Sequence, residues 1–349
     1  MQHKIKENKI SRKKLRSNSV NLFLLVLPIV IFIFSMFIGR YVISPILVIK
    51  ILLSKIIYID PTWHPTMESV IWDVRLPRAI AAMLVGAGLS VSGASFQGLF
   101  KNPLVSPQIL GVSAGAGFGA ALALLLLEKL ILVQISAFIG GVVAVAFTYK
   151  ISKIYKTTPL LMLVLSGMVT AALFSALTSL IKYVADPLNK LPAVVFWLMG
   201  SFNAVSRGDL IFLGPFIIVG CAVLVLIRWR INVLSLGEEE ARSMGINTEQ
   251  LKFIIISSAT IITAASVCMS GIIGWVGLVI PHVGRILVGP DHKKLIPVSL
   301  ILGASYLLIV DDIARSAIST EIPIGILTAI IGAPFFAYLI RKSKSGWNY

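Results

Sequence analysis

The chain has 349 residues, of which 57% are hydrophobic and 13% are charged, and its mean hydropathy is +0.93. A soluble domain of this length cannot bury so much apolar surface, so the composition excludes a soluble enzyme and predicts an integral membrane protein. The net charge of +16 comes without a basic, aromatic-rich soluble domain, which argues against nucleic-acid binding.

Apolar stretches recur along the chain, several of them close to the roughly 20 helical residues that cross a hydrocarbon core. We predict ten spans, at residues 21–43, 76–97, 108–127, 130–150, 159–183, 209–229, 253–272, 274–289, 295–314 and 323–340. The predicted fold class is an all-α integral membrane protein. Its expected organisation is a basic tail at 1–19, one transmembrane domain at 20–342 with a loop at 231–250, and a C-terminal tail at 343–349.

Positive charge gives the expected orientation. With the N-terminus inside, most of the 31 Lys and Arg residues fall on the cytoplasmic side, as the positive-inside rule requires. Because the number of predicted spans is even, both termini are expected in the cytoplasm. The first span follows a basic segment, as the core of a signal peptide would, but it is too long and lacks a small-residue cleavage site. We therefore expect it to be retained.

Two predicted external segments are longer than simple turns. Residues 44–74 carry Trp63, His64 and Trp72, which are more typical of anchors at the membrane interface than of ligands. Residues 186–207 contain an apolar run too short to span, which predicts a re-entrant or interfacial helix.

Two arginines, Arg75 and Arg78, mark the start of the second predicted span. A pair of cations at the mouth of a membrane helix suggests an entrance that receives an acidic group. Small residues repeat every four positions on this span and on the next, at Gly86, Ser90 and Ala94 and at Gly111, Gly115 and Gly119. This spacing predicts close helix packing.

The sequence lacks the motifs that would indicate nucleotide hydrolysis, metal binding or catalysis. The sequence has no phosphate-binding loop, so any ATP hydrolysis must come from another chain. His and Cys residues lack metal-ligand spacing, and neither a nucleophilic triad nor a catalytic carboxylate pair is present, so we expect no metal site and no catalytic residue. Asp311 and Asp312 adjoin Arg315 near the end of the ninth span, which fits a local charge cluster or the relay of an ion-coupled carrier.

The segment from Leu236 to Gly245, between the sixth and seventh spans, predicts a short helix. Gly237 precedes three glutamates that favour the positive end of a helix dipole, and Gly245 is a plausible stop. A solvated surface helix and a contact surface for a soluble partner both fit this pattern.

The segment from Arg75 to Gly119 resembles the signature of the FecCD-type permeases, the membrane subunits of ABC importers for ferric siderophores, haem and cobalamin. Further motifs of that family follow in the family's order: Val195-Phe196-Trp197-Leu198-Met199-Gly200-Ser201, the Gly237 to Gly245 segment, Gly274-Trp275-Val276-Gly277-Leu278-Val279-Ile280-Pro281-His282, Asp312-Ile313-Ala314-Arg315 and Glu321-Ile322-Pro323-Ile324-Gly325. The resemblance covers roughly residues 60–342.

The resemblance implies a type II ABC importer permease fold with ten helices, located as a multi-pass protein in the cytoplasmic (inner) membrane of a prokaryote. The implied partners are a second permease subunit (an identical copy or a sister chain), two cytoplasmic ATPase subunits that hold ATP and magnesium, and an extracytoplasmic substrate-binding protein. No cofactor is expected on this chain. The expected cargo is a metal chelate, first a ferric siderophore, with haem, cobalamin and molybdate as alternatives. Two different classes of membrane protein, an ion-coupled carrier and a non-transporting scaffold, also fit the hydropathy pattern.

The resemblance also implies roles for particular residues. Those expected to dock the binding protein are Arg75, Arg78 and Arg315. Those expected to couple to the ATPase are Gly237, Glu238, Glu239, Glu240, Ala241, Arg242 and Gly245. Those expected to close the cytoplasmic end of the pathway are Asn102 and Leu104, with Thr157 and Thr158 as a second constriction.

Overall fold

The computed structural model describes residues 24–127, 129–153 and 157–343. Within these ranges the regular structure is helical and contains no β-strand. The predicted tail at 1–19 lies outside the described residues, as does all but the first residue of the predicted tail at 343–349. Ser343 instead ends the last helix.

A helix at Leu24–Phe37 opens the described chain. It is followed by α2 (Pro45–Leu53), α3 (Pro65–Ser69), η1 (Val70–Arg75), α4 (Leu76–Phe100), η2 (Pro107–Leu110), α5 (Val112–Leu126), α6 (Leu130–Ser152), α7 (Leu160–Val184), α8 (Lys190–Met199), α9 (Arg207–Leu226), α10 (Arg228–Leu234), α11 (Glu238–Ser243), α12 (Thr248–Ser270), α13 (Val276–Val288), α14 (His292–Ser316) and α15 (Ile324–Ser343).

Among the described residues, six helical stretches are long and apolar enough to cross a membrane. They are Pro65–Phe100, Leu130–Ser152, Leu160–Val184, Arg207–Leu226, Thr248–Ser270 and His292–Ser316. The other four predicted spans coincide with shorter apolar helices, so the total of ten crossings stays a prediction.

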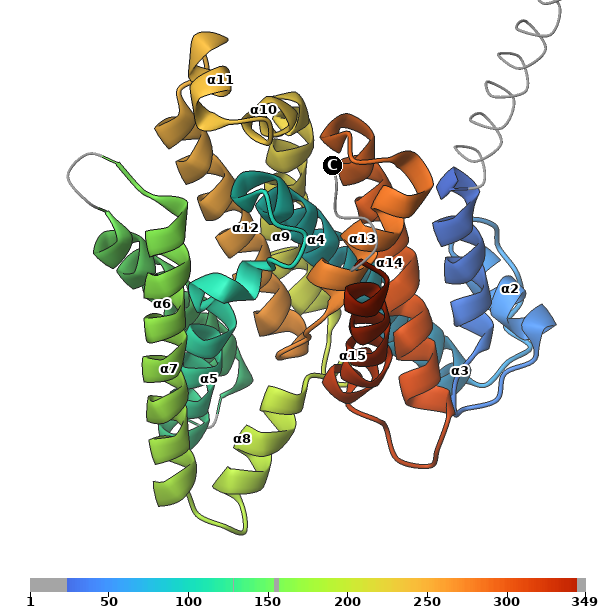
Figure 1. Cartoon of the computed structure of the whole chain (residues 1–349). Helices are drawn as coiled ribbons and strands as arrows, with labels where there is room; N and C mark the ends of the chain where they lie inside the picture. Colours follow the sequence, from blue (N-terminus) through green and yellow to red (C-terminus); the bar gives the residue numbers. More distant parts are fainter. Residues whose placement is uncertain (1–23, 128, 154–156, 344–349) are drawn as a thin grey trace, which may run out of the picture.

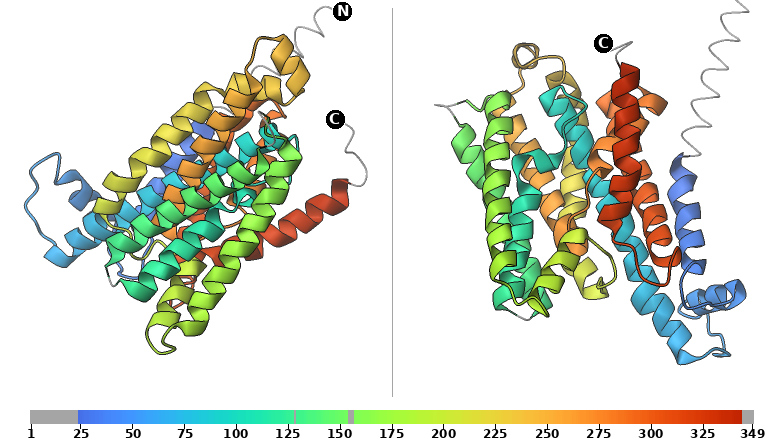
Figure 2. Two further views of the ribbon diagram at one scale, coloured as in Figure 1. Left: turned by 90° about the vertical axis from the view of Figure 1, so that its left-hand side faces the viewer. Right: turned by 60° about the horizontal axis from the view of Figure 1, so that its bottom comes forward.

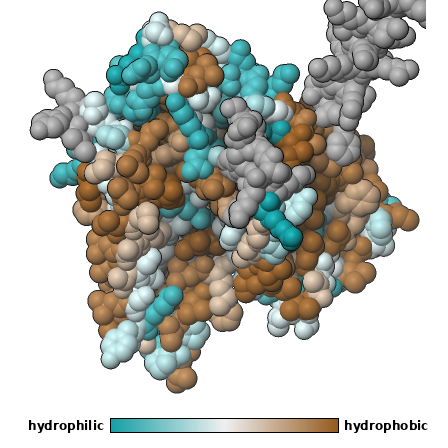
Figure 3. Space-filling view, in the orientation of Figure 1, coloured by the Kyte–Doolittle hydropathy of each residue, from teal (hydrophilic) through white to brown (hydrophobic). Residues whose placement is uncertain are grey.

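The loops gather at two opposite ends of the helix bundle. Figure 1 shows α10, α11 and the turn after α4 at one end, and α8 with the loop between α14 and α15 at the other. The second view in Figure 2 shows the same grouping. Hydrophilic residues cover the α11 end, whereas hydrophobic residues cover the flanks of the bundle (Figure 3). The alternation of loops fits the predicted topology, and which end faces the cytoplasm stays a prediction.

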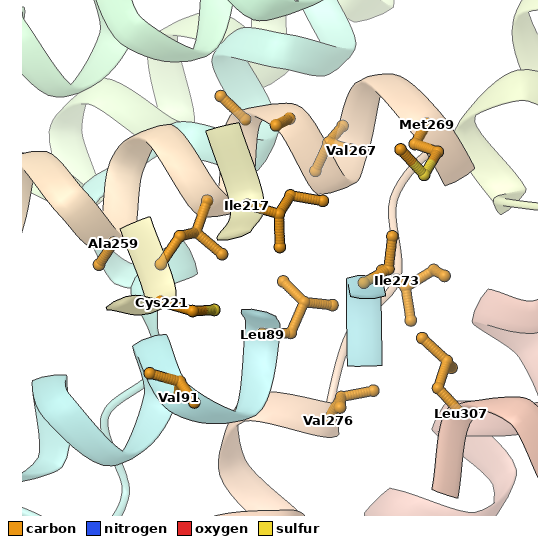
Figure 4. Close-up of a cluster of buried hydrophobic side chains, with 14 of the residues drawn as sticks. Leu89, Val91, Ile217, Cys221, Ala259, Val267, Met269, Ile273, Val276 and Leu307 are labelled. Carbon is orange, nitrogen blue, oxygen red and sulfur yellow. The ribbon is translucent and has the colours of Figure 1, made fainter. Parts of the chain in front are cut away.

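Helix α4 forms the centre of the bundle because it packs against α9, α12, α13 and α14. Figure 4 shows where these helices meet, with Leu89 of α4 near Ile217 of α9 and Val276 of α13. Helices α5, α6 and α7 pack against one another beside this group. Burial of α4 on all sides explains why its sequence is apolar or small at every position except Arg78 and Gln97.

Close backbone contacts confirm the small-residue pattern of α4. A Cβ on Gly86 would collide with the carbonyl oxygen of Gly303 in α14, and a Cβ on Gly93 would collide with that of Gly277 in α13. The neighbouring helices therefore approach α4 more closely than any side chain at these positions would allow.

The stripe predicted for the third span is only partly correct. Gly115 and Gly119 do pack against the backbone of α6. Gly111, however, has a φ of 84° and separates the 3₁₀ helix η2 from α5. Because that left-handed conformation suits glycine, the predicted span is broken there, and α5 is a helix of 15 residues.

The predicted external segments contain more structure than expected. Helix α2 lies inside the 44–74 loop, and the helical stretch of α4 extends back to Pro65. Trp63 is buried in the core, so its assignment as an interfacial anchor is wrong. The His64 ring accepts a hydrogen bond from the Thr66 amide and caps α3. In the second segment, the apolar run forms the helix α8, and its re-entrant or interfacial position stays a prediction.

Candidate functional site

The first candidate site is a cluster of buried charges where the first helix, α4 and α14 meet. Arg78 of α4 donates from Nε and Nη2 to the Asp311 carboxylate at 2.9 to 3.0 Å. Its Nη1 donates to Glu321 Oε1 at 2.9 Å, in the loop between α14 and α15. One guanidinium thus joins three segments that are far apart in the sequence.

Arg315 and Arg75 complete this cluster. Arg315 forms an ion pair with Asp312 on its own helix and donates to the Ser35 carbonyl oxygen at 2.7 Å. Arg75 donates to the backbone carbonyl oxygens of Met36 and Tyr41. Both arginines therefore tie the end of the helix at Leu24–Phe37 to the rest of the bundle.

The structure corrects the picture of Arg75, Arg78 and Arg315 as free cations at an entrance. Their exposed fractions are 3%, 5% and 6%, and every one of them has hydrogen-bond partners within the chain. The local cluster expected from Asp311, Asp312 and Arg315 is present, and it extends to Arg78. Their docking role stays a prediction.

A cavity of about 550 Å³ opens at the same end of the bundle. Hydroxyl and amide side chains from several segments line it, together with aromatic side chains of α8. Glu321 lines this cavity and also contacts Arg78, so the loop before α15 belongs to both the cavity and the charge cluster. Gln134 donates to Asp209 at 2.7 Å in the cavity wall.

The second candidate site is helix α11 at the opposite end, where the predicted short helix is present. Its coupling role stays a prediction. Gly237 precedes it, and Gly245 follows with a φ of 79°, a conformation that suits glycine and ends the helix. Ala241 is buried, whereas Glu239 and Glu240 are exposed. The predicted coupling residues thus divide into one side that holds the helix and one that faces outward.

Glu238 and Arg242 have partners within the chain. Arg242 donates to the Thr248 hydroxyl at 3.1 Å, and Glu238 accepts from Lys252 Nζ at 2.9 Å. Lys252 is 2% exposed, and the sequence patterns did not identify it. The predicted seventh span begins at residue 253, directly after Lys252. A single lysine next to an apolar segment does not indicate that its side chain is buried.

The predicted gate residues lie in two separate loops. The Asn102 side chain accepts from the Leu104 amide at 2.9 Å and forms the turn that follows α4. Thr157 and Thr158 precede α7, and the Thr158 carbonyl oxygen accepts from Lys252 Nζ at 3.2 Å. Closure of a pathway by these residues stays a prediction.

Comparisons with known proteins agree on one family. The model of the FecCD transport family matches residues 25–342. The molybdate import permease MolB of Haemophilus influenzae is 43% identical over 325 residues, covering 93% of this chain and 95% of MolB. The cobalamin import permease BtuC of Halobacterium salinarum is 40% identical over 280 residues, which cover 80% of this chain and 75% of BtuC.

The solved structures give the same result. One, described as an inward-facing ABC transporter assigned to the metal-chelate type, has a TM-score of 0.83 and 41% identity, and covers 93% of this chain and 99% of its own. A second, PsaBC of Streptococcus pneumoniae, has a TM-score of 0.55 and 18% identity and supports the fold alone, with coverage of 78% of this chain and 94% of its own.

Proposed function

This chain belongs to the FecCD transport family and is the permease subunit of an ABC importer for metal chelates or related substrates, and we propose that it imports molybdate. The observation that carries the substrate is the similarity to MolB over nearly the full length of both chains. A ferric chelate is the second candidate, because an iron chelatin permease of Helicobacter pylori is 40% identical over 279 residues. Family membership favours an ABC importer subunit over an ion-coupled carrier or a scaffold.

We propose the following assembly. A second permease chain packs against this one, two ATPase subunits bind ATP and magnesium at the α11 end, and a binding protein delivers substrate at the Arg78 end. The predicted cytoplasmic side is the α11 end, and the membrane is the inner membrane of a prokaryote. Membership in the family and the two loop-rich ends of the bundle support this arrangement.

Uptake by the complete transporter tests the substrate. We expect vesicles containing the permease, its ATPase and its binding protein to accumulate labelled molybdate when ATP is present, and to accumulate little ferric siderophore. Vesicles without ATP and vesicles treated with an ionophore serve as controls. Uptake of the siderophore with no uptake of molybdate would replace the first candidate by the second.

The outward-facing side of the coupling segment gives a second test. Glu239 and Glu240 are exposed on α11, flanked by exposed Leu236 and Met244, which is the mixed apolar and acidic surface that a soluble subunit can bind. Changing Glu239 and Glu240 together to Lys is expected to reverse this charge and to weaken ATPase binding about 10-fold or more.

Co-purification of the ATPase with the permease measures this effect. The control is Glu68→Lys, at a partly exposed acidic residue of α3 that pairs with Lys55 at the opposite end of the molecule, and it is expected to leave ATPase binding unchanged. Normal ATPase binding by the double variant would remove these glutamates from the proposed contact.

We also propose that the binding protein docks at Arg75, Arg78 and Arg315. Because these arginines are already paired within the chain, docking would have to exchange one of those partners. Of the two carboxylates on Arg78, Asp311 is 1% exposed and Glu321 is 21% exposed. An acidic residue of the binding protein would therefore replace Glu321 and leave Asp311 in place.

A further inference from the structure

We propose that Lys252 is the positioning residue that connects the coupling helix α11 to the start of α7, so that movement of α11 reaches α7. The inference rests on the proposed function, because it assigns α11 to ATPase contact. It adds a residue to which no sequence motif assigns a role.

Lys252 is a buried cation with a complete set of partners. Its ammonium group has three donors, and three oxygens accept from it: Glu238 Oε1 at 2.9 Å, Glu249 Oε1 at 2.9 Å and the Thr158 carbonyl oxygen at 3.2 Å. Burial of an ammonium is costly unless it is paired and fully hydrogen-bonded. The three contacts therefore hold the side chain in one position.

The partners of Lys252 come from three different segments. Glu238 is the first residue of α11, Glu249 lies on α12 with Lys252, and Thr158 lies two residues before α7 begins. Figure 1 shows α11 and the beginnings of α12 and α7 at the same end of the bundle. A displacement of α11 must either break the Glu238 pair or carry the ammonium with it, and the ammonium also holds the backbone at Thr158.

Helix α7 is suited to receive such a movement. Only 22% of its most apolar stretch is buried within the chain, compared with 78% for α12. α12 is thus fixed in the core, whereas most of α7 faces away from it, towards lipid or the second permease. Lys252 stands on the fixed helix between the coupling helix and the exposed one.

The two carboxylates on Lys252 provide a matched experiment. Glu238 and Glu249 contact the same ammonium at 2.9 Å, and their side chains are 31% and 29% exposed. They differ in position, because Glu238 belongs to α11 and Glu249 to the helix that already carries Lys252. Loss of Glu238 should therefore cut the connection, whereas loss of Glu249 should leave it intact.

The measurement is the number of ATP molecules hydrolysed per substrate imported by the complete transporter in vesicles. Glu238→Gln and Lys252→Met are expected to raise this ratio about 10-fold, within the range of typical coupling between sites. Glu249→Gln and Lys252→Arg are expected to stay within about 2-fold of the unmutated ratio, since each keeps a charged bridge to Glu238. Should Lys252→Met fail to assemble, the comparison of Glu238→Gln with Glu249→Gln decides the question.

The distance between spin labels at Ser243 of α11 and Leu161 of α7, two exposed positions, gives an independent readout. Nucleotide is expected to change this distance in the unmutated complex and in Glu249→Gln, but not in Glu238→Gln. Equal effects of the two glutamine variants would show a merely structural role for Lys252 and overturn the inference, as would loss of bound ATPase from Glu238→Gln. If the unmutated complex showed no ATP-driven uptake, the proposed function itself would fail and this inference with it.

Discussion

Replacing Arg78 by alanine is expected to destabilise the folded permease by about 3–5 kcal/mol, the cost of removing one partner from a buried ion pair. Arg78 and Asp311 side chains are 6% and 1% exposed, so the remaining carboxylate would lie in the protein interior with only its longer contact to Arg315 Nε, at 3.8 Å. Asp311→Asn removes the other charge of the same pair and should have a similar effect. Thermal unfolding of the purified permease in detergent micelles measures both.

An exposed ion pair on the Arg78 side of the bundle serves as the control. Arg207 pairs with Asp73 at 3.1 Å, but their side chains are 55% and 58% exposed. Arg207→Ala is therefore expected to cost less than about 1 kcal/mol. Replacing Arg78 and Asp311 together by leucine should restore part of the lost stability, because the most deeply buried carboxylate is removed together with its partner. Glu321 also loses Arg78, but its side chain is 21% exposed and can reach solvent.

The same variants separate a structural role of Arg78 from a docking role. If Arg78 only docks the binding protein, Arg78→Ala should lower the affinity for the binding protein without changing the unfolding temperature. Asp311→Asn should then leave that affinity unchanged. If Arg78→Ala keeps the unfolding temperature of the unmutated permease and loses only affinity for the binding protein, the buried Arg78–Asp311 pair does not stabilise this end of the bundle.

Some features of the fold follow directly from the sequence. The glutamates after Gly237 and the glycine at 245 predicted α11 correctly, because the helix dipole and a left-handed stop act within a few residues. The small residues at Gly86 and Ser90 likewise identified the face of α4 that packs closely on α14, since helical spacing is also local.

Other features depend on contacts between distant segments, which no local pattern reveals. Arg78 meets Asp311 across 233 positions of sequence, so the sequence showed Arg78 as a cation at a membrane boundary and Asp311 only as a neighbour of Asp312 and Arg315. Lys252 looked like a cation at the start of a span because its partner Glu238 lies on another helix. Charge at the end of a membrane helix thus identified where the candidate site residues lie, but their partners came only from the fold.

Adding one methyl group at Gly93 is expected to destabilise the permease at the upper end of the roughly 1–3 kcal/mol cost of overpacking. The Cβ of alanine would collide with the carbonyl oxygen, carbonyl carbon and Cα of Gly277, all of them backbone atoms of α13. Backbone cannot rotate away as a side chain can, so α4 and α13 would have to separate. We expect Gly86→Ala to act in the same way through the backbone of Gly303 in α14.

The control for this prediction is a glycine-to-alanine change that is expected to stabilise the permease. At Gly208 in α9 the nearest atom to an added Cβ is Ser206 Oγ at 3.5 Å, an ordinary contact. Gly208→Ala is therefore expected to leave packing intact and to gain up to about 1 kcal/mol of helix propensity. Unfolding temperatures of the two variants in the same detergent give the comparison. Equal stability of Gly93→Ala and Gly208→Ala would mean that α13 can move off α4 at little cost, and close approach of the backbones would then not be what fixes the centre of the bundle.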